Sequence, residues 1–369
     1  MLIQKLNIII IVFGLLFSQQ VFSKELKPYF DKSEYKELLL ISIRTTTLEK
    51  YYSKFPESEK YKMVYQSKVV GLDNHWDLWV NTDSTIAVIS IRGTIPTAES
   101  SLANIYAAMV PAKGELYLTE TDTFKYELAT NPNAAVHIGW LISMAYLSRD
   151  ILPKIDSIYN AGIKNILLMG HSQGGAINYL LTAYLYNLQQ NGIIPGDIRF
   201  KTYCSAAPKP GNLYFAYHYE MLTQNGWGYN VVNSVDWVPE TPISIQTLND
   251  INSANPFTNA KSQIKELKFP KNIVLKSVYN KLDKPTKKAQ KNYEKYLGEK
   301  TSGFILKSLK GFIPPPNYFH SNNYVRTGAT IVLSPDKEYF SIFPADTDNI
   351  LTHHNFEPYL FLLDKLELN

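Results

Sequence analysis

The segment 170–175, Gly-His-Ser-Gln-Gly-Gly, constrains the fold of this chain more than any other feature. The apolar run 164–169 before it is typical of a short buried strand, and apolar residues recur at helical spacing over 176–188. A G-x-S-x-G pattern between a strand and a helix predicts a tight turn that holds its serine in a strained conformation at the end of a sheet. Ser172 is therefore the candidate nucleophile, and the backbone N–H of Gln173 is expected to face a developing oxyanion.

Strand-like and helix-like patterns alternate between about residues 75 and 240, which predicts an α/β fold with a mostly parallel central sheet and flanking helices. The stretch 93–137 is expected to be irregular, with one short helix near 101–109. The helical pattern of 139–159 contains Pro153, which is expected to kink or split the helix. Near the C-terminus we expect strands over 324–333 and 338–343 and a final helix over 354–366.

Residues 243 to about 320 differ from the rest and are interpreted as a helical insertion in a single domain that covers 24–369. The part 261–310 contains 14 lysines and 4 acidic residues. Its basic face is either simply solvated or attracts an anionic surface such as a membrane. The net charge of the whole chain is only +4, which gives no support for nucleic acid as a partner.

The first 23 residues have the pattern of a secretory signal peptide. Lys5 supplies the positive start, 8–17 is an apolar run, and the mature chain is expected to begin near Lys24. An uncleaved membrane anchor is the alternative, although the apolar run is short for a membrane span. We therefore expect an exported protein, secreted or periplasmic, and its one cysteine, Cys204, excludes an intramolecular disulfide.

A serine nucleophile needs a base and an acid that orients the base. In α/β-hydrolases the order along the chain is serine, acid, histidine, which leaves His320, His353 and His354 as candidate bases. His354 opens the last apolar helix, so it is favoured over the other two. Asp236 follows an apolar strand, and the neighbouring Trp237, Val238 and Pro239 are expected to keep its carboxylate dry.

A second oxyanion donor is expected where the apolar strand 85–91 ends. Gly93 permits close approach of a substrate, and Thr94 can offer both its backbone N–H and its hydroxyl. This chemistry requires neither a metal nor a cofactor.

Together these residues make the chain resemble the class 3 lipases, the fungal-type triacylglycerol lipase family of α/β-hydrolases. The similarity covers about 85–242 and resumes near 350. It is carried by six segments: 88–94 (VISIRGT), 137–140 (HIGW), 170–175 (GHSQGG), 207–212 (APKPGN), 231–239 (VVNSVDWVP) and 354–359 (HNFEPY).

The resemblance implies Ser172 as nucleophile, Asp236 as acid and His354 as base, with Thr94 and Gln173 as oxyanion donors. It also implies a mobile lid after Thr94, whose apolar face would consist of Leu102, Ile105, Tyr106, Met109 and Val110. The expected activity is hydrolysis of lipid esters, with peripheral contact to a lipid surface. The alternatives are phospholipase A1 action on glycerophospholipids and a surface-binding protein that keeps the fold without catalysis.

Overall fold

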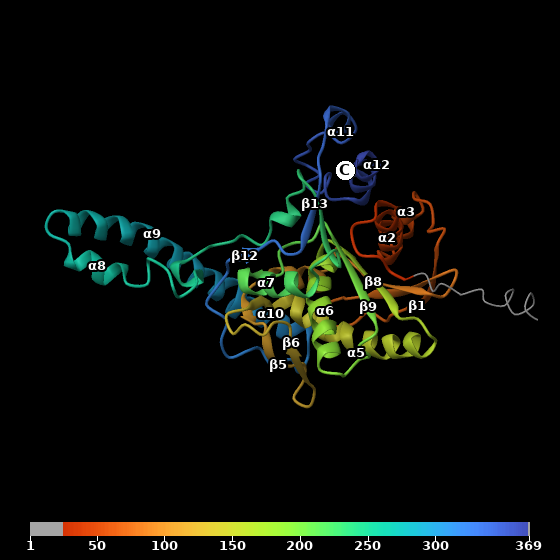
Figure 1. The fold of residues 1–369 in the computed structure, drawn as a ribbon, viewed down its shortest axis with the longest axis horizontal. Coiled ribbons are helices and arrows are strands. Elements are labelled where there is room, and N and C mark those ends of the chain that lie inside the picture. The colour runs from red at the N-terminus through yellow and green to blue at the C-terminus, as the bar shows by residue number, and fades with distance from the viewer. Residues whose placement is uncertain (1–24, 368–369) are drawn as a thin grey trace, which may run out of the picture.

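The computed structural model describes residues 25–367 of the 369-residue chain (Figure 1). The expected signal peptide, 1–23, lies outside the described residues. Within 25–367, none of the helices combines the length and the apolar character needed to cross a membrane.

A seven-stranded sheet forms the centre of the molecule, and its order is β1-β2-β3-β8-β9-β11-β13. The strands from β3 onward pair in parallel, whereas β1 and β2 are antiparallel. This confirms the expected mostly parallel sheet. The strands are β1 (Tyr61–Gln66), β2 (Trp76–Asn81), β3 (Ile86–Ile91), β8 (Asn165–His171), β9 (Arg199–Ser205), β11 (Gly228–Asn233) and β13 (Ala329–Leu333).

Helices cover both faces of this sheet, because successive side chains of a strand point to opposite sides. In β8, Ile166 and Leu168 belong to one apolar core, and Leu167 and Met169 belong to the other. The first core is completed by α5 (Ile138–Asn160), α6 (Gln173–Gln190) and α7 (Leu213–Leu222). The second is completed by α2 (Lys32–Thr45) and α12 (Phe356–Lys365), with α3 (Glu49–Tyr52) beside them (Figure 1).

The stretch 93–137 is more regular than expected. The short helix α4 (Ala98–Ile105) begins three residues before the expected start, because the Thr97 hydroxyl caps it by accepting the N–H of Ser100. It is followed by β4 (Met109–Pro111), the hairpin β5 (Lys113–Tyr117) and β6 (Thr123–Glu127), and β7 (Ala135–His137). Strands β4 and β7 join β10 (Gly211–Asn212) and β12 (Tyr324–Val325) in a second, four-stranded sheet.

Two local expectations differ from the structure. Helix α5 is not split at Pro153, which lies on the solvent side of the helix together with Arg149, so water can satisfy the carbonyl that proline leaves without a donor. The expected strand 338–343 is a helix, α11 (Lys337–Ile342), because the Asp336 carboxylate caps it by accepting the N–H of Tyr339. The expected strand 324–333 is divided into β12 and β13, with Gly328 in a left-handed conformation between them.

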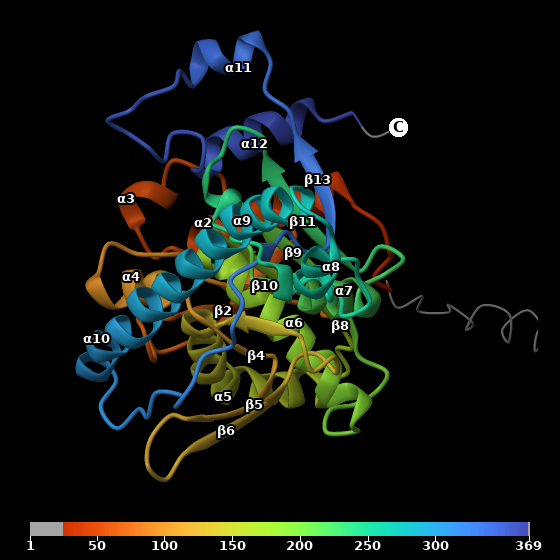
Figure 2. The ribbon, with the colours of Figure 1, turned by 90° about the vertical axis from the view of Figure 1, so that its left-hand side faces the viewer.

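Two helices extend from the body as an arm, which we define as α8 (Ala260–Glu266) and α9 (Lys271–Glu294) (Figures 1 and 2). Helix α9 continues through a π-helical segment, η3 (Lys295–Lys300), into α10 (Thr301–Ser308), which packs against α4 in the body. Two short 3₁₀ turns, η1 (Val238–Glu240) and η2 (Leu248–Asp250), lie between β11 and the arm.

Candidate active site

The turn at Ser172 has the strained geometry expected from the sequence. Strand β8 ends at His171 and helix α6 begins at Gln173, with Ser172 between them at φ 59° and ψ −130°. The glycines are required by space: a Cβ on Gly170 would lie 2.3 Å from the backbone of Gly174, and one on Gly174 would lie 2.2 Å from the carbonyl oxygen of Ile91. The turn therefore fits only with glycine on both sides of the serine.

Asp236 and His354, 118 residues apart, are in direct contact. The imidazole Nδ1 of His354 lies 2.7 Å from the Asp236 carboxylate oxygen Oδ2. The Tyr359 hydroxyl donates to the same oxygen at 2.9 Å, and the backbone N–H of Val238 donates to Oδ1 at 3.0 Å. Asp236 follows β11 and is buried, so its charge is held by these three donors rather than by water.

The contact with Asp236 fixes the tautomer of His354. An ionised carboxylate only accepts hydrogen bonds, so the proton of a neutral imidazole lies on Nδ1. The other ring nitrogen, Nε2, is then free to accept a proton. His354 and Ser172 line the same cavity.

The other two candidate histidines lie elsewhere. His353 contacts the Tyr339 hydroxyl through Nδ1 at 2.8 Å and does not line the cavity of Ser172. His320 is 81% exposed and contacts Glu294 at 3.0 Å on the wall of a different cavity. Of the three, only His354 meets the expected acid.

Both expected oxyanion donors also line the cavity of Ser172. Gln173 is the first residue of α6, so no earlier turn of the helix offers a carbonyl to its backbone N–H. Thr94 follows β3, and its hydroxyl oxygen accepts a hydrogen bond from Asn104 Nδ2 at 3.0 Å. Because that oxygen is the acceptor, the hydroxyl hydrogen of Thr94 remains free to donate into the cavity.

Asn104 was not predicted from the sequence, although it connects much of the site. Its side-chain oxygen accepts the indole N–H of Trp140 at 3.0 Å and the Gln173 amide at 2.9 Å. Gln173 also donates to the carbonyl of Ser100 at 2.9 Å, so α4 is attached to the start of α6. Nothing in the sequence pattern distinguishes Asn104 from any polar residue on a short helix.

His171 is a second residue whose role the sequence did not indicate. Its Nε2 lies 2.8 Å from the backbone carbonyl of His354 and must donate there, so its Nδ1 accepts from the Ser205 hydroxyl at 3.0 Å. The Tyr35 hydroxyl lies 2.6 Å from the Ser205 oxygen and donates to it. Burial, and then the nearby His354, lower the pKa of His171, which keeps this donor chain neutral and fixes the loop that carries His354.

The cavity at Ser172 has a volume of about 710 Å³ and a mostly apolar lining. Large apolar side chains that are also exposed to solvent lie around it: Leu48, Ile105, Trp237, Ile243 and Leu351. Trp237 itself is not buried: its indole is exposed at this cavity and donates to the carbonyl of Ile350 at 2.7 Å. Val238 and Pro239 are buried as expected.

The expected lid face is wrong for three of its five residues. Tyr106, Met109 and Val110 are buried in the apolar cores, because the chain turns inward after α4 to form β4. Ile105 is exposed at the cavity, and Leu102 is partly buried.

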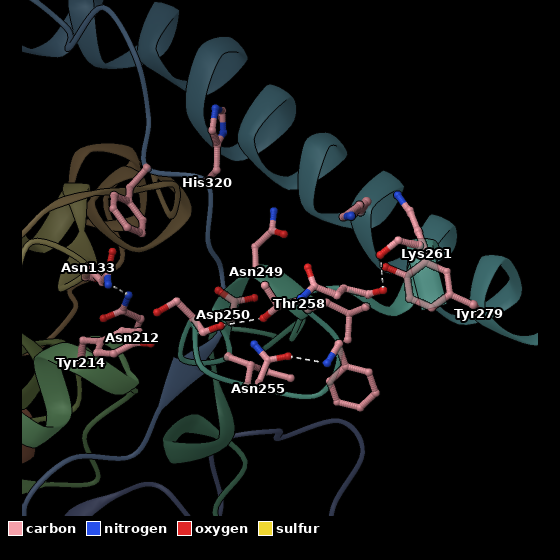
Figure 3. A pocket seen from close by; sticks show the side chains of 18 of the residues that line it. Asn133, Asn212, Tyr214, Asn249, Asp250, Asn255, Thr258, Lys261, Tyr279 and His320 are labelled. Carbon is pink, nitrogen blue, oxygen red and sulfur yellow. Dashed lines mark hydrogen bonds between the residues drawn. The ribbon is translucent and has the colours of Figure 1, made fainter. Parts of the chain in front are cut away.

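A second cavity, of about 1040 Å³, lies between the arm and the body (Figure 3). It is larger than the cavity of Ser172, but neither Ser172, Asp236 nor His354 lines it. Its buried carboxylate, Asp250, accepts hydrogen bonds from Thr247 and Ser321, which stabilise the local loop. Across residues 25–367, no group of three His, Cys, Asp or Glu side chains is placed to hold a metal ion.

Two of the motifs noted in the sequence have structural roles. His137 caps α5 by accepting the N–H of Trp140, and burial lowers its pKa to about 3. Asn212 caps α7 by accepting the N–H of Phe215 at 3.1 Å, and its amide donates to the carbonyl of Asn133 at 2.7 Å (Figure 3).

Similar solved structures include Lip2 lipase from Yarrowia lipolytica, with 19% identity, a TM-score of 0.44, and coverage of 60% of this chain and 78% of that one. Triacylglyceride lipase from Rhizomucor miehei has 18% identity and a TM-score of 0.42, and the match covers 58% of this chain and 77% of that one. Lipase II from Rhizopus niveus has 18% identity and a TM-score of 0.42, over 57% and 74% of the two chains. No curated protein matches the chain significantly.

The family assignment depends on the sequence. The model of the family described as lipase (class 3) matches residues 88–245, which is less than half of the chain. The match contains the last four residues of β3, Ser172 and Asp236, and it ends before His354. The segment 88–245 is therefore similar to the class 3 lipase family.

Proposed function

We propose that this protein is a serine carboxylester hydrolase that cleaves lipid esters. The observation that carries the proposal is the 2.7 Å contact between His354 and a buried Asp236, with His354 on the wall of the same cavity as the strained Ser172. The family match and the apolar lining of that cavity support an ester with a hydrocarbon chain as substrate.

In the proposed reaction the Ser172 oxygen attacks the ester carbonyl carbon while His354 Nε2 takes the serine proton. The oxyanion receives hydrogen bonds from the backbone N–H groups of Gln173 and Thr94 and from the Thr94 hydroxyl. The C–O bond of the ester then breaks, and the leaving alkoxide takes the proton back from His354. A water molecule, deprotonated by His354, hydrolyses the acyl-serine and restores the enzyme. Asp236 holds the imidazole and stabilises its charged form.

We also propose that a lid controls access to the cavity of Ser172. Helix α4 is the one segment after Thr94 for which we keep this role, because it presents the exposed Ile105 at the cavity. Export rests on the signal-peptide pattern of residues 1–23.

A second candidate is phospholipase A1 action on glycerophospholipids. The observation that favours it is the lysine-rich arm, whose α9 contributes Tyr293 to the cavity of Ser172. A cationic element next to the cavity would favour a substrate with an anionic head group.

The experiment is hydrolysis of an ester series, from soluble short-chain esters through emulsified triacylglycerol to phospholipid vesicles. Wild-type protein is expected to hydrolyse esters, with a higher rate on aggregated lipid, and Ser172→Ala is expected to lose at least about three orders of magnitude in kcat. The best substrate separates lipase from phospholipase A1.

The matched control compares the two adjacent histidines. His354→Asn should lose activity to the level of Ser172→Ala, whereas His353→Asn should keep activity within about threefold, because its imidazole contacts Tyr339 rather than Asp236. If the wild-type protein hydrolyses no ester and Ser172 is not labelled by a fluorophosphonate, the proposal fails. The protein would then be a surface-binding member of the fold without catalysis.

A further inference from the structure

Helix α9 is amphipathic in an unusual sense, because the face that it buries is polar and the face that it exposes is apolar. Its buried residues are Asp283 and Gln290, with exposures of 4% and 5%. Val274, Val278 and Leu282 follow at i, i+4 and i+8 on another face, with exposures of 57%, 48% and 68%. A helix in water normally shows the opposite arrangement.

The polar side of α9 has a partner within the chain. Tyr279 and Lys287 line the large cavity between the arm and the body, and Figure 3 shows Tyr279 on the side of the helix that faces this cavity. Asp283, one turn before Lys287, pairs with it at 2.9 Å. The apolar face therefore lies on the side of the helix that points away from this cavity.

More apolar side chains are exposed where the arm turns from α8 into α9. Phe269, Leu267 and Ile273 lie there and are exposed to solvent. Together with Val274, Val278 and Leu282 they form what we call the arm apolar surface. A group of large apolar side chains exposed on one arm is typical of an interaction site.

The charge next to this surface indicates what covers it. Lys281, Lys284 and Lys288 are exposed on α9 at i, i+3 and i+7, and no carboxylate of residues 25–367 lies within ion-pairing distance of them. The part 261–310 has 14 lysines and 4 acidic residues, so two copies of the arm would repel each other. Apolar side chains flanked by lysines are typical of helices that lie in the interface of an anionic membrane.

The arm is also continuous with the cavity of Ser172. Tyr293 near the end of α9 and Leu297 in η3 both line that cavity. A membrane held by the arm would therefore lie near the entrance to the site, where Leu48, Trp237 and Ile243 are also exposed.

We infer that the arm apolar surface and its flanking lysines dock this protein on the surface of an anionic lipid bilayer. The apolar side chains enter the head-group region, and the lysines pair with lipid phosphates. This inference rests on the proposed function for its biological purpose, because docking would bring lipid esters to Ser172. The docking itself does not require catalysis.

The test measures binding to vesicles in the Ser172→Ala background, so that no lipid is hydrolysed. The probes are vesicles of phosphatidylcholine alone and of phosphatidylcholine mixed with phosphatidylglycerol, at low and high salt. Val274→Gln/Val278→Gln/Leu282→Gln should weaken binding to the mixed vesicles by at least about tenfold. Lys281→Gln/Lys284→Gln/Lys288→Gln should weaken it by roughly a hundredfold at low salt and much less at high salt.

Matched controls change exposed apolar residues and exposed lysines in and near β1, an edge strand of the central sheet. Met63→Gln/Val64→Gln/Val69→Gln removes exposed apolar side chains in and after β1, and Lys27→Gln/Lys62→Gln/Lys68→Gln removes exposed lysines. Both controls should bind vesicles as the parent does. Glutamine is used in α9 because it favours helices, and circular dichroism checks that each variant is folded.

The possible outcomes separate the inference from the proposed function. Unchanged vesicle binding in both α9 variants overturns the inference, as does an equal loss in the β1 controls. A change of oligomeric state in the α9 variants by light scattering also overturns it, in favour of a second copy on this face. With Ser172 intact, the α9 variants should hydrolyse a soluble short-chain ester at the wild-type rate, and a loss there would make the arm part of the active site instead. If the wild-type protein hydrolyses no ester but the α9 variants lose vesicle binding, the proposed function fails and the docking stands.

Discussion

The two large cavities of this molecule differ in how their polar side chains are held. At the cavity of Ser172, polar side chains arrive from the ends of parallel strands β3, β8 and β11 and from the loop before α12. At the cavity beside the arm, Asp250 is held by Thr247 in the same turn and by Ser321 from the opposite segment. The second cavity is the larger one, yet only the first holds the strained Ser172 and an imidazole, that of His354, which is paired with a buried aspartate. A catalytic site is therefore distinguished by polar side chains that meet at the carboxyl ends of strands, and not by the volume of its cavity.

The aspartates of the two cavities give the strongest test of this difference. Both are buried and accept several hydrogen bonds, but only Asp236 accepts one from an imidazole. Asp236→Asn should lower kcat on the order of 10⁴-fold, because an amide can donate to Nδ1 and so stabilise the wrong tautomer of His354. Ester hydrolysis under saturating substrate measures this effect.

Asp250→Asn is the matched control. We expect kcat within about twofold of wild type and a free energy of unfolding lower by about 1–3 kcal/mol, since hydrogen bonds are lost without any change at His354. Equal losses of kcat in the two variants would mean that the cavity beside the arm also serves catalysis, and the contrast between the cavities would disappear.

Asn104 provides a finer test of how the site is held together. Asn104→Ala removes the donor that orients the Thr94 hydroxyl and the acceptor that holds the Gln173 amide. We expect kcat to fall by roughly tenfold to a hundredfold, with a smaller change in KM, because an oxyanion donor acts mainly in the transition state.

A double-mutant cycle shows whether Asn104 acts through Thr94. In a Thr94→Val background the further effect of Asn104→Ala on kcat should be smaller than in wild type. Ser101→Ala, one turn earlier on α4, should have little effect, since its hydroxyl only donates to the carbonyl of Thr97. Additive losses would show that Asn104 acts elsewhere, for example through Trp140.

The difference between the two regions also explains what the sequence could predict. The strand β8 and the turn at Ser172 were predictable because an apolar run and two glycines that no other residue can replace are local signals. Asp236 and His354 could be proposed from their positions next to apolar elements, but their contact joins residues 118 positions apart and only the fold brings it about. Asn104 and His171 contact Gln173 and His354 across 69 and 183 positions, so no local pattern indicated these partners.

The expectations that proved wrong also come from contacts that a local sequence pattern does not show. Residues 338–343 have apolar residues that suit a strand, but the cap at Asp336 favours a helix. Tyr106, Met109 and Val110 have the composition of a mobile apolar face, but β4 places them in the core. In the arm, the lysine content was evident from the sequence, whereas the burial of the polar side of α9 follows from its packing beside a cavity and could not be read from composition.

The last expected effect concerns stability at low pH, at a histidine that packs behind the cavity of Ser172. His137, behind the cavity of Ser172, is buried, and burial lowers its pKa to about 3 in the folded protein. The pKa of histidine in an unfolded chain is about 6.5, so between about pH 6.5 and 3 the unfolded state binds one more proton at this residue. The free energy of unfolding therefore falls with decreasing pH, by up to about 1.4 kcal/mol per pH unit from this group. His171, whose pKa is also lowered by burial, acts in the same direction.

His137→Asn tests this, because asparagine can still cap α5 but does not take up a proton. Urea unfolding between pH 8 and pH 4 should give a lower free energy of unfolding for the variant at pH 8, since the contacts of the imidazole with Trp140 and with the carbonyl of Asn104 are lost. As the pH falls, the curves of wild type and variant should converge, with a slope difference of up to about 1.4 kcal/mol per pH unit. Parallel curves would mean that His137 is protonated in the folded protein at these pH values. The hydrogen bond from His137 to Asn104 would then involve a charged donor, and the cavity of Ser172 would be supported by a cation instead of the neutral network inferred from the burial of His137 and His171.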